Sequence, residues 1–175
     1  MVWSHKHFYE LLRIDPSNAD YQCDVGMALA AQGKTGEAKD HFMEALRINP
    51  NHFSANYHMG LALVREGQLK ESAKYLLKTI EMNPNNPTTL KMLGWVLGNS
   101  GRVEEAIHYF EEALKFAPND AELHDNMGVA LVKMGRLDQA LGHFSKALEI
   151  DNSYDIARNH LETVQGQMEK ASKNP

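Results

Sequence analysis

Prolines recur along this chain at a fixed interval. Pro16, Pro50, Pro84 and Pro118 stand 34 positions apart, and the next step falls on Asn152. Because a proline cannot continue an established helix, such regular spacing marks the regular end of a structural unit. A period of this length indicates an array of stacked repeats, each of which buries its apolar face only against its neighbours.

Aligning the segments on these prolines brings similar residues into register. Glycine fills two columns, at positions 26, 60, 94 and 128 and at positions 33, 67, 101 and 135. Other columns hold leucine, small residues or a large apolar residue: Leu29, Leu63, Leu97 and Leu131; Ala38, Ser72, Ala106 and Ala140; Phe42, Leu76, Phe110 and Phe144; Ala45, Thr79, Ala113 and Ala147; Leu46, Ile80, Leu114 and Leu148. Chance does not place this many columns in register, so the chain is built from repeats.

Each segment has the pattern of a helical hairpin. In the third, apolar residues at three-four spacing predict a first helix over about residues 86–100, and Gly101 ends it in the manner of a C′ glycine. A second helix is expected over about residues 103–116. The two helices are predicted to meet where Gly94 and Ala106 remove side-chain bulk, so that Phe110 packs beside the backbone.

This pattern resembles the tetratricopeptide repeat (TPR) family, whose small, aromatic and proline positions all have counterparts here. The resemblance implies an all-α, right-handed solenoid covering nearly the whole chain as a single domain, 1–175. The expected parts are a half repeat (1–18), four full repeats (19–52, 53–86, 87–120 and 121–152), a capping helix (153–172) and a short tail (173–175).

The sequence departs from the family pattern at several positions. Ser72, Leu76 and Thr79 weaken the match of the second repeat, and Asn152 replaces the last proline. The large aromatic residue that often begins the first helix is missing, and its place is taken by Gln22, Asn56, Leu90 and His124. The half repeat places Phe8, Leu11 and Leu12 in packing positions without a partner helix, which predicts further residues upstream, as in a truncated chain.

Composition excludes several classes of protein. The chain is 43% hydrophobic and 23% charged, as expected of an ordinary folded protein without membrane insertion. A net charge of −5 argues against a nucleic-acid binder that depends on phosphate contacts. No secretory signal is apparent, and the single Cys23 cannot form an internal disulfide. The expected location is cytoplasmic, with a peripheral place on an organelle or membrane-bound assembly as the alternative.

The family groups its first helices on the concave side, so the second stripe of each first helix is the expected binding surface. This stripe contains an apolar band whose residues are not needed for packing within each hairpin: Met27, Tyr57, Leu61, Val64, Trp95, Val129 and Val132. Contiguous exposed apolar residues commonly mark interaction sites. Beside the band lie Gly98 and the polar residues expected to confer specificity: Arg65, Lys91, Asn99, Glu122 and Asp125. Trp95 and Gly98, one turn apart, form the predicted anchor pocket.

Other chemistry is not indicated. The clamp of lysines and asparagines with which some family members grip a C-terminal carboxylate is absent, and Glu122 and Asp125 would repel such a group. The nine histidines show no pair at zinc-site spacing, and no nucleophile lies in a pattern with a base. We therefore expect no catalytic residue, no metal and no cofactor.

The expected function is a non-catalytic scaffold that holds a peptide or helix of a partner protein in its concave groove. A first alternative is a self-assembling, homo-oligomeric coat or platform, a role the resemblance suggests because bacterial magnetosome-associated scaffolds belong to this family. Residues 51–100 carry a net charge of +2 and residues 101–150 a net charge of −4, which would favour pairing between copies. A second alternative is a targeting domain of a larger protein.

Overall fold

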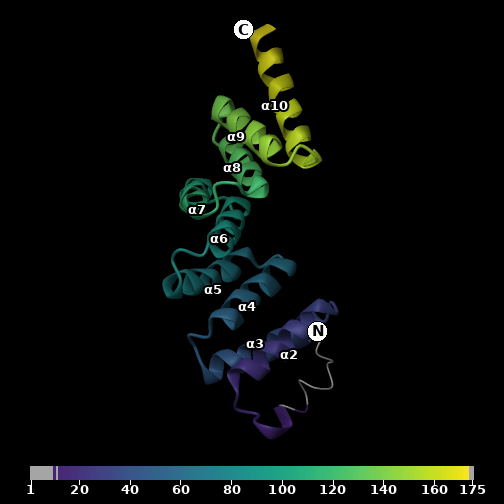
Figure 1. Ribbon diagram of the computed structural model, residues 1–175, viewed down its shortest axis with the longest axis vertical. Helices are drawn as coiled ribbons and strands as arrows, with labels where there is room; N and C mark the ends of the chain where they lie inside the picture. The colour runs from purple at the N-terminus through teal and green to yellow at the C-terminus, as the bar shows by residue number, and fades with distance from the viewer. Residues whose placement is uncertain (1–9, 11, 174–175) are drawn as a thin grey trace. The chain divides into compact units, whose positions relative to one another are not determined.

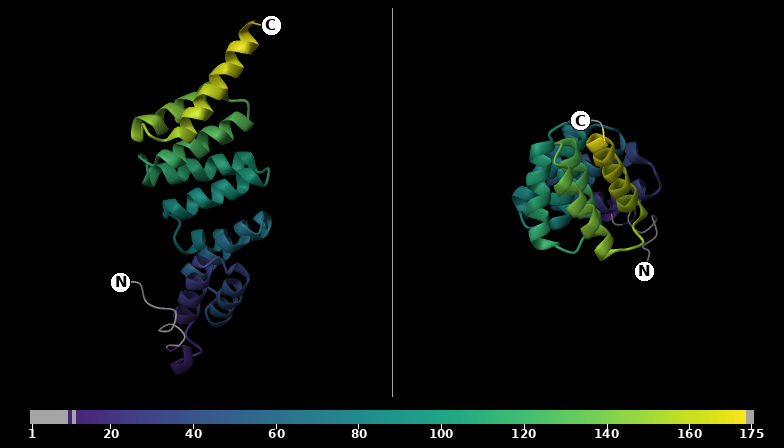
Figure 2. Two further views of the ribbon diagram at one scale, coloured as in Figure 1. Left: turned by 90° about the vertical axis from the view of Figure 1, so that its right-hand side faces the viewer. Right: turned by 90° about the horizontal axis from the view of Figure 1, so that it is seen from above.

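The computed structural model describes residue 10 and residues 12–173, and within them the regular structure is entirely helical. The helices follow one another as antiparallel pairs, side by side in Figures 1 and 2. The elements are α2 (Ala19–Ala31), α3 (Thr35–Ile48), α4 (Phe53–Arg65), α5 (Leu69–Met82), α6 (Pro87–Asn99), α7 (Val103–Phe116), α8 (Ala121–Lys133), α9 (Leu137–Ile150) and α10 (Asp155–Lys173). The all-α prediction of helix-turn-helix repeats is confirmed.

The chain divides into two compact units at the loop between α5 and α6. Unit 1 is Met1–Pro84 and contains helices α2 to α5, and unit 2 is Asn85–Pro175 and contains α6 to α10. Each unit is described by itself below. The repeat boundaries and the single domain expected from the sequence remain predictions.

The turn within each hairpin is set by one glycine. Gly33, Gly67, Gly101 and Gly135 have φ between 72° and 87°, a backbone conformation that other residues rarely adopt. In the first turn, the N–H of Gly33 donates to Ala30 O and the next N–H donates to Leu29 O, the pattern of a Schellman motif. The predicted role of this glycine column, ending each first helix, is therefore confirmed.

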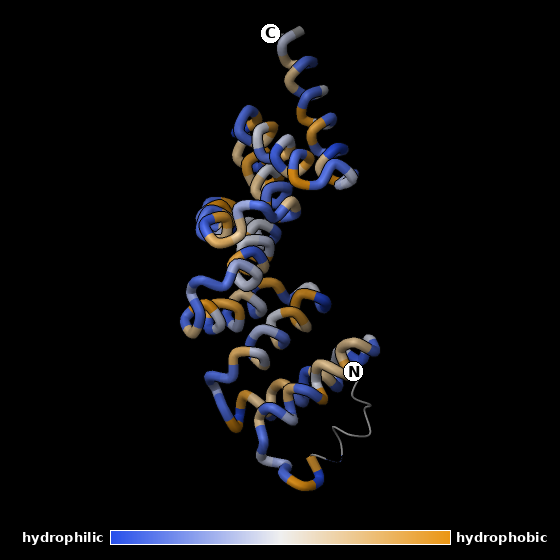
Figure 3. The backbone as a smooth tube through the Cα atoms, in the orientation of Figure 1, coloured by the Kyte–Doolittle hydropathy of each residue, from blue (hydrophilic) through white to orange (hydrophobic). Residues whose placement is uncertain are grey.

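The core of each hairpin depends on the other glycine column. A Cβ added to Gly26, Gly94 or Gly128 would lie 2.5–2.6 Å from a phenylalanine ring of the paired helix. These rings, Phe42, Phe110 and Phe144, are buried beside alanines that are themselves buried. In Figure 3, hydrophobic and hydrophilic residues alternate along the second helices, whose apolar stripe faces the first helix.

The second repeat keeps this packing despite its unusual residues. Leu76 takes the place of the phenylalanine, 2.9 Å from the position of a Cβ on Gly60. The two buried hydroxyls find carbonyl acceptors, since Ser72 Oγ donates to Gly60 O (2.8 Å) and Thr79 Oγ1 donates to Leu76 O (2.6 Å). Because both polar groups are satisfied, their burial is tolerated.

The column that lacks the large aromatic residue has a structural role of its own. Gln22 donates to Pro16 O (3.2 Å), Asn56 to Pro50 O (3.0 Å), and His124 to Pro118 O (3.0 Å). These bonds tie the start of a first helix to the loop before it. In the third repeat the buried Leu90 makes no such bond. Asn56 Oδ1 is buried and has no hydrogen-bond partner among the described residues.

The structure describes more of the C-terminal end of the predicted array than of its N-terminal end. Phe8 and Leu11 of the predicted half repeat lie outside the described residues, whereas Leu12 is half-buried against the core of unit 1. At the other end α10 packs on α9 through the buried Ala157 and Val164, as expected of a capping helix. The apolar Ile156 of this helix is instead exposed.

Candidate functional site

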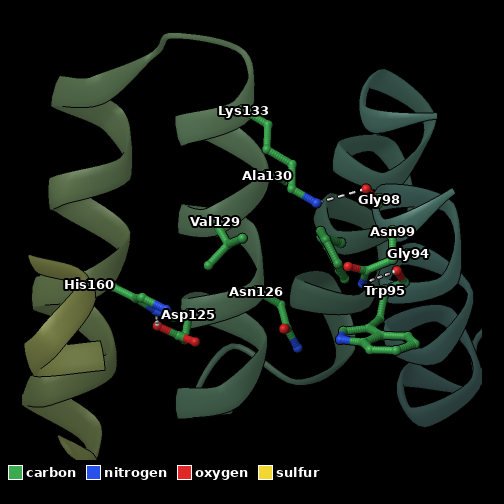
Figure 4. A pocket seen from close by; sticks show the side chains of 11 residues that line it. Gly94, Trp95, Gly98, Asn99, Asp125, Asn126, Val129, Ala130, Lys133 and His160 are labelled. Carbon is green, nitrogen blue, oxygen red and sulfur yellow. Dashed lines mark hydrogen bonds and ion pairs between the residues drawn. The ribbon is translucent and has the colours of Figure 1, made fainter. Parts of the chain in front are cut away.

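Unit 2 contains a cavity of about 220 Å³ between α6 and α8, closed on one side by the first turns of α10 (Figure 4). Every residue that lines it belongs to residues 85–175, so it is complete within one unit. The lining residues are Gly94, Trp95, Gly98, Asn99, Phe110, Asp125, Asn126, Val129, Ala130, Lys133 and His160. The predicted pair Trp95 and Gly98 therefore does border a hollow.

An indole forms one wall of the cavity. Leu90, Leu93 and Leu97 point α6 into the core, which leaves Trp95 on the outer face with 37% of its surface exposed. One turn further on, the buried Gly98 adds no side chain to the wall. The equivalent positions in the other repeats are Ala30, Val64 and Val132, so the third repeat is the one in which a bare backbone lies beside a large aromatic ring.

Two polar side chains brace one end of the cavity against the backbone. Lys133 Nζ donates to Gly98 O (2.9 Å), and Asn99 Nδ2 donates to Trp95 O (2.8 Å). Figure 4 shows the lysine reaching from α8 across to α6. In unit 1, Arg65 makes the equivalent contact with Ala30 O (2.9 Å). These residues support the geometry of the groove face, and Lys133 and Arg65 each hold the preceding first helix.

A hydrogen-bonded pair, the buried Asp125 and the partly exposed His160, forms the opposite wall. His160 Nδ1 lies 2.8 Å from Asp125 Oδ1, and Asp125 is only 4% exposed. The imidazole also packs against Phe144, with ring centroids 5.4 Å apart. Burial raises the pKa of the Asp125 carboxyl, and the hydrogen bond and charge of His160 oppose that rise only in part. The structure thus places the nearly buried Asp125 at the base of the cavity, whereas the sequence suggested a specificity residue beside the apolar band.

One side chain of the lining is free to receive a ligand. Asn126 lies between Trp95 and Asp125 in Figure 4, and its amide makes no hydrogen bond to any residue that the structure describes. An amide offers both a donor and an acceptor, which suits the N–H and C=O groups of a peptide backbone.

The remaining predicted residues of unit 2 lie outside the cavity lining. Lys91 Nζ is 2.6 Å from Glu122 Oε2 and 2.9 Å from Asp120 Oδ2, so the fold brings the predicted Lys91 and Glu122 together. The Lys91 ammonium is thus shared between two carboxylates, and both predicted residues are already engaged in ion pairs. Val132 is half-buried on α8, the helix that also carries Glu122.

The predicted residues of unit 1 form a separate group on its first helices. Met27 is 39% exposed and Arg65 is exposed, whereas Tyr57, Leu61 and Val64 are half-buried. The Tyr57 ring meets the His58 ring edge-on at 5.4 Å between centroids. The continuous band across both units expected from the sequence remains a prediction.

Six residues of the lining were not predicted as site residues: Asn126, Ala130, Lys133, His160, and Gly94 and Phe110, which the sequence assigned to packing within the hairpin. The first three each follow a predicted residue of α8 by one position, so a wider helical stripe would have included them. His160 comes from the capping helix, 35 residues after its partner Asp125, and only the repeat period hinted at this neighbourhood.

No group of three or more His, Cys, Asp or Glu residues among residues 10 and 12–173 could hold a metal ion. Over the same residues, no helix has the length and apolar character needed to cross a bilayer. Burial raises the pKa of the Cys23 thiol to about 12, which disfavours the reactive thiolate.

Comparison with known proteins identifies the class that the fold defines. A family model for the N-terminal TPR repeats region of Psidin matches residues 28–143. The chain therefore belongs to the tetratricopeptide repeat family, as its sequence pattern predicted. Proteins of this fold act through protein–protein interaction and are typically non-catalytic scaffolds. No match is found among curated proteins.

Solved structures give three informative likenesses. YrrB, a TPR protein with an unusual peptide-binding site, is 27% identical, with a TM-score of 0.80 over 89% of this chain and 80% of YrrB. MamA residues 41 to the end from Desulfovibrio magneticus RS-1 are 25% identical, with a TM-score of 0.80 over 86% of this chain and 85% of that one. MamA of AMB-1 is 30% identical, with a TM-score of 0.70 over 77% of this chain and 79% of that one.

Proposed function

We propose that this protein is a non-catalytic interaction module that binds a peptide segment of a partner protein at the Trp95 cavity of unit 2. The observation that carries the proposal is the combination of an exposed indole with a hollow lined by glycine, valine and a free amide. A volume of about 220 Å³ suits one anchoring side chain rather than a drug-sized ligand. The likeness to YrrB supports a peptide as the ligand.

The chemistry of the lining residues indicates which part of the peptide each would contact. Trp95 and Val129 supply apolar surface, and burial of an aromatic residue at the centre of an interface commonly dominates its affinity. Asn126 is placed to pair with a backbone amide of the peptide. The residues predicted in unit 1 (Met27, Tyr57, Leu61, Val64 and Arg65) would extend the contact if the peptide continues along the first helices. The contact of these unit 1 residues with the peptide is part of the proposal.

The test uses peptides selected on the intact chain from a display library of random sequences. Binding of the selected peptides is then measured by calorimetry with wild type, Trp95→Ala and Phe116→Ala. Phe116 is the matched control because it is an exposed aromatic residue of unit 2 outside the cavity. We expect Trp95→Ala to weaken binding by about 2 kcal/mol or more, with helical content unchanged, and Phe116→Ala to have little effect. Equal affinity for wild type and Trp95→Ala would refute the proposal.

A second candidate is a self-assembling scaffold. It is favoured by the likeness to MamA, a magnetosome TPR protein, at 25–30% identity over more than three quarters of this chain. Exposed apolar side chains outside the Trp95 cavity, Met43 and Phe116 among them, would be available for contacts between copies. A cytoplasmic or peripheral location on an assembly would follow from either candidate and is part of the proposal.

A further inference from the structure

The base of the Trp95 cavity holds a carboxylate that is only half engaged. Asp125 Oδ1 accepts from His160, and no hydrogen bond or ion pair within the described residues reaches Oδ2. In Figure 4 the side chain of Asp125 lies between His160 and Asn126, with its second oxygen away from the imidazole. Asp125 is only 4% exposed, but Oδ2 is not among the fully buried, unpartnered side-chain atoms of the described residues, so this oxygen is an acceptor that an incoming donor can reach.

The electrostatics of this carboxylate favour a positive ligand. Burial of the Asp125 side chain is the largest influence on its pKa and raises it, while His160 lowers it by less. A single imidazole partner therefore does not offset the loss of water around the charge. A charged donor at Oδ2 would favour the ionised carboxylate, because a hydrogen bond between two charged groups is stronger than one between neutral groups.

The neighbouring charges leave this position open to a cation. The carboxylates Asp120 and Glu122 share the single Lys91 ammonium, so the three groups together carry a net negative charge, which also favours a cation. Lys133, the lysine of the lining, is held at the far end of the cavity by Gly98 O. His160 occupies the other oxygen of Asp125.

The other walls match the shape of a long basic side chain. Such a side chain has an apolar stem and a charged head, and the stem packs well against apolar surface. Val129 and Trp95 offer that surface, and the face of an indole attracts a planar cation. The free amide oxygen of Asn126 offers a second acceptor beside Asp125. A guanidinium has five donors in a planar fork and can bridge two acceptors, which an ammonium does less well.

We propose that the cavity takes an arginine side chain of the bound peptide, with its stem against Trp95 and Val129 and its guanidinium shared between Asp125 Oδ2 and Asn126 Oδ1. This inference rests on the proposed function and specifies the partner: a peptide with an arginine anchor beside apolar residues. It also gives Asp125 and His160 distinct roles, since Asp125 binds the cation and His160 orients the carboxylate.

The experiment changes the ligand first and the protein second. Each arginine of a peptide selected on the intact chain is replaced in turn by citrulline, which keeps the shape and removes the charge, and by norleucine, which keeps the stem. We expect one citrulline replacement to weaken binding to the wild type by roughly tenfold or more. With Asp125→Asn, arginine and citrulline peptides should bind within about twofold of each other, since the charge partner is gone.

Asp125→Asn keeps an amide oxygen that can accept from His160, and circular dichroism with urea unfolding establishes whether the variant is folded. If the variant is unfolded, the comparison of arginine and citrulline peptides on the wild type still tests the arginine anchor. Selected peptides that lack arginine, or that bind equally well with citrulline, would overturn the arginine anchor while leaving Trp95-dependent peptide binding intact. Absence of any Trp95-dependent peptide would instead overturn the proposed function.

Discussion

Phe110 of α7 packs so closely against the backbone of α6 that a Cβ added to Gly94 would lie 2.5 Å from its Cε1 atom. Real Cβ atoms essentially never approach another atom this closely, so the two helices would have to separate or the ring would have to move. We expect Gly94→Ala to lower the free energy of unfolding by about 1–2 kcal/mol, because overpacking of about 1–3 kcal/mol outweighs the better helix propensity of alanine. Urea unfolding followed by circular dichroism measures the change.

Gly142→Ala is the matched control for this substitution. Gly142 lies within α9 of the same unit, and an added Cβ would meet nothing within 4 Å. Alanine should therefore stabilise the helix by up to about 1 kcal/mol. The same sign for both substitutions would contradict the close-approach role of Gly94.

Residues whose role repeats every 34 positions could be read from the sequence. The spacing predicted a helix over about 103–116, and α7 is Val103–Phe116. The glycine and phenylalanine columns likewise predicted the packing of Gly94 on Phe110, since the same pair recurs in two other repeats. These features involve residues close together in the sequence, and each recurs in several repeats, so the sequence pattern was sufficient to predict them.

The contacts that make up the candidate site could not be read in the same way. The pair Asp125 and His160 occurs once, joins helices 35 residues apart and depends on side-chain direction rather than on periodicity. Lys91 was expected to be free for a partner, and its position gave no sign that Asp120 and Glu122 would engage it. Sequence pattern located the stripe on which the site lies but not which charges the fold had already paired.

The column of Gln22, Asn56, Leu90 and His124 offers a test of buried polar groups. Asn56 makes two hydrogen bonds through Nδ2, to Pro50 O and His52 O, but its buried Oδ1 has no partner among the described residues. We expect Asn56→Leu to change the free energy of unfolding by less than about 1 kcal/mol, because loss of the two bonds is offset by removal of the unsatisfied acceptor.

The reverse substitution, Leu90→Asn, serves as the comparison. Leu90 is 2% exposed in unit 2, so asparagine would lose apolar burial and place an amide in the core. We expect a loss of about 2 kcal/mol or more, measured by the same urea titration. Equal losses for the two substitutions would show that the amide of Asn56 is as necessary as the side chain of Leu90.

Stability should fall in mildly acidic solution. Burial lowers the pKa of His41, His58 and His143 below the usual histidine value of 6.5, and for His143 the neighbouring His124 lowers it further. Because the pKa of each of these histidines is lower in the folded state than in the unfolded chain, the unfolded state takes up protons first as the pH falls. Their stabilising contribution is therefore complete above about pH 6.5 and is lost progressively below it.

Urea unfolding at pH 7.5 and pH 5.5, values chosen to bracket about 6.5, measures this loss. His143→Gln should reduce the difference between the two conditions, since glutamine can still donate to His124 Nδ1 but does not titrate. An unchanged difference in this variant would exclude His143 as a contributor.

Sedimentation of the chain over a wide range of concentration separates the two candidate functions. For a peptide-binding module acting alone we expect a monomer throughout, because no symmetric apolar face is required for its activity. Growth of the sedimenting species with concentration would favour the self-assembling scaffold. Its loss in Phe116→Ala or Met43→Ala would locate the contact between copies.

The central claim is that the Trp95 cavity receives a partner peptide. Heteronuclear NMR spectra of the labelled chain, recorded during titration with a selected peptide, test it most directly. We expect saturable shifts at the indole N–H of Trp95, the side-chain amide of Asn126 and the methyl groups of Val129. The indole N–H of Trp95 should lose its shift when the peptide arginine is removed. Saturable shifts confined to residues outside the cavity, such as Met43 and Tyr75, would contradict it.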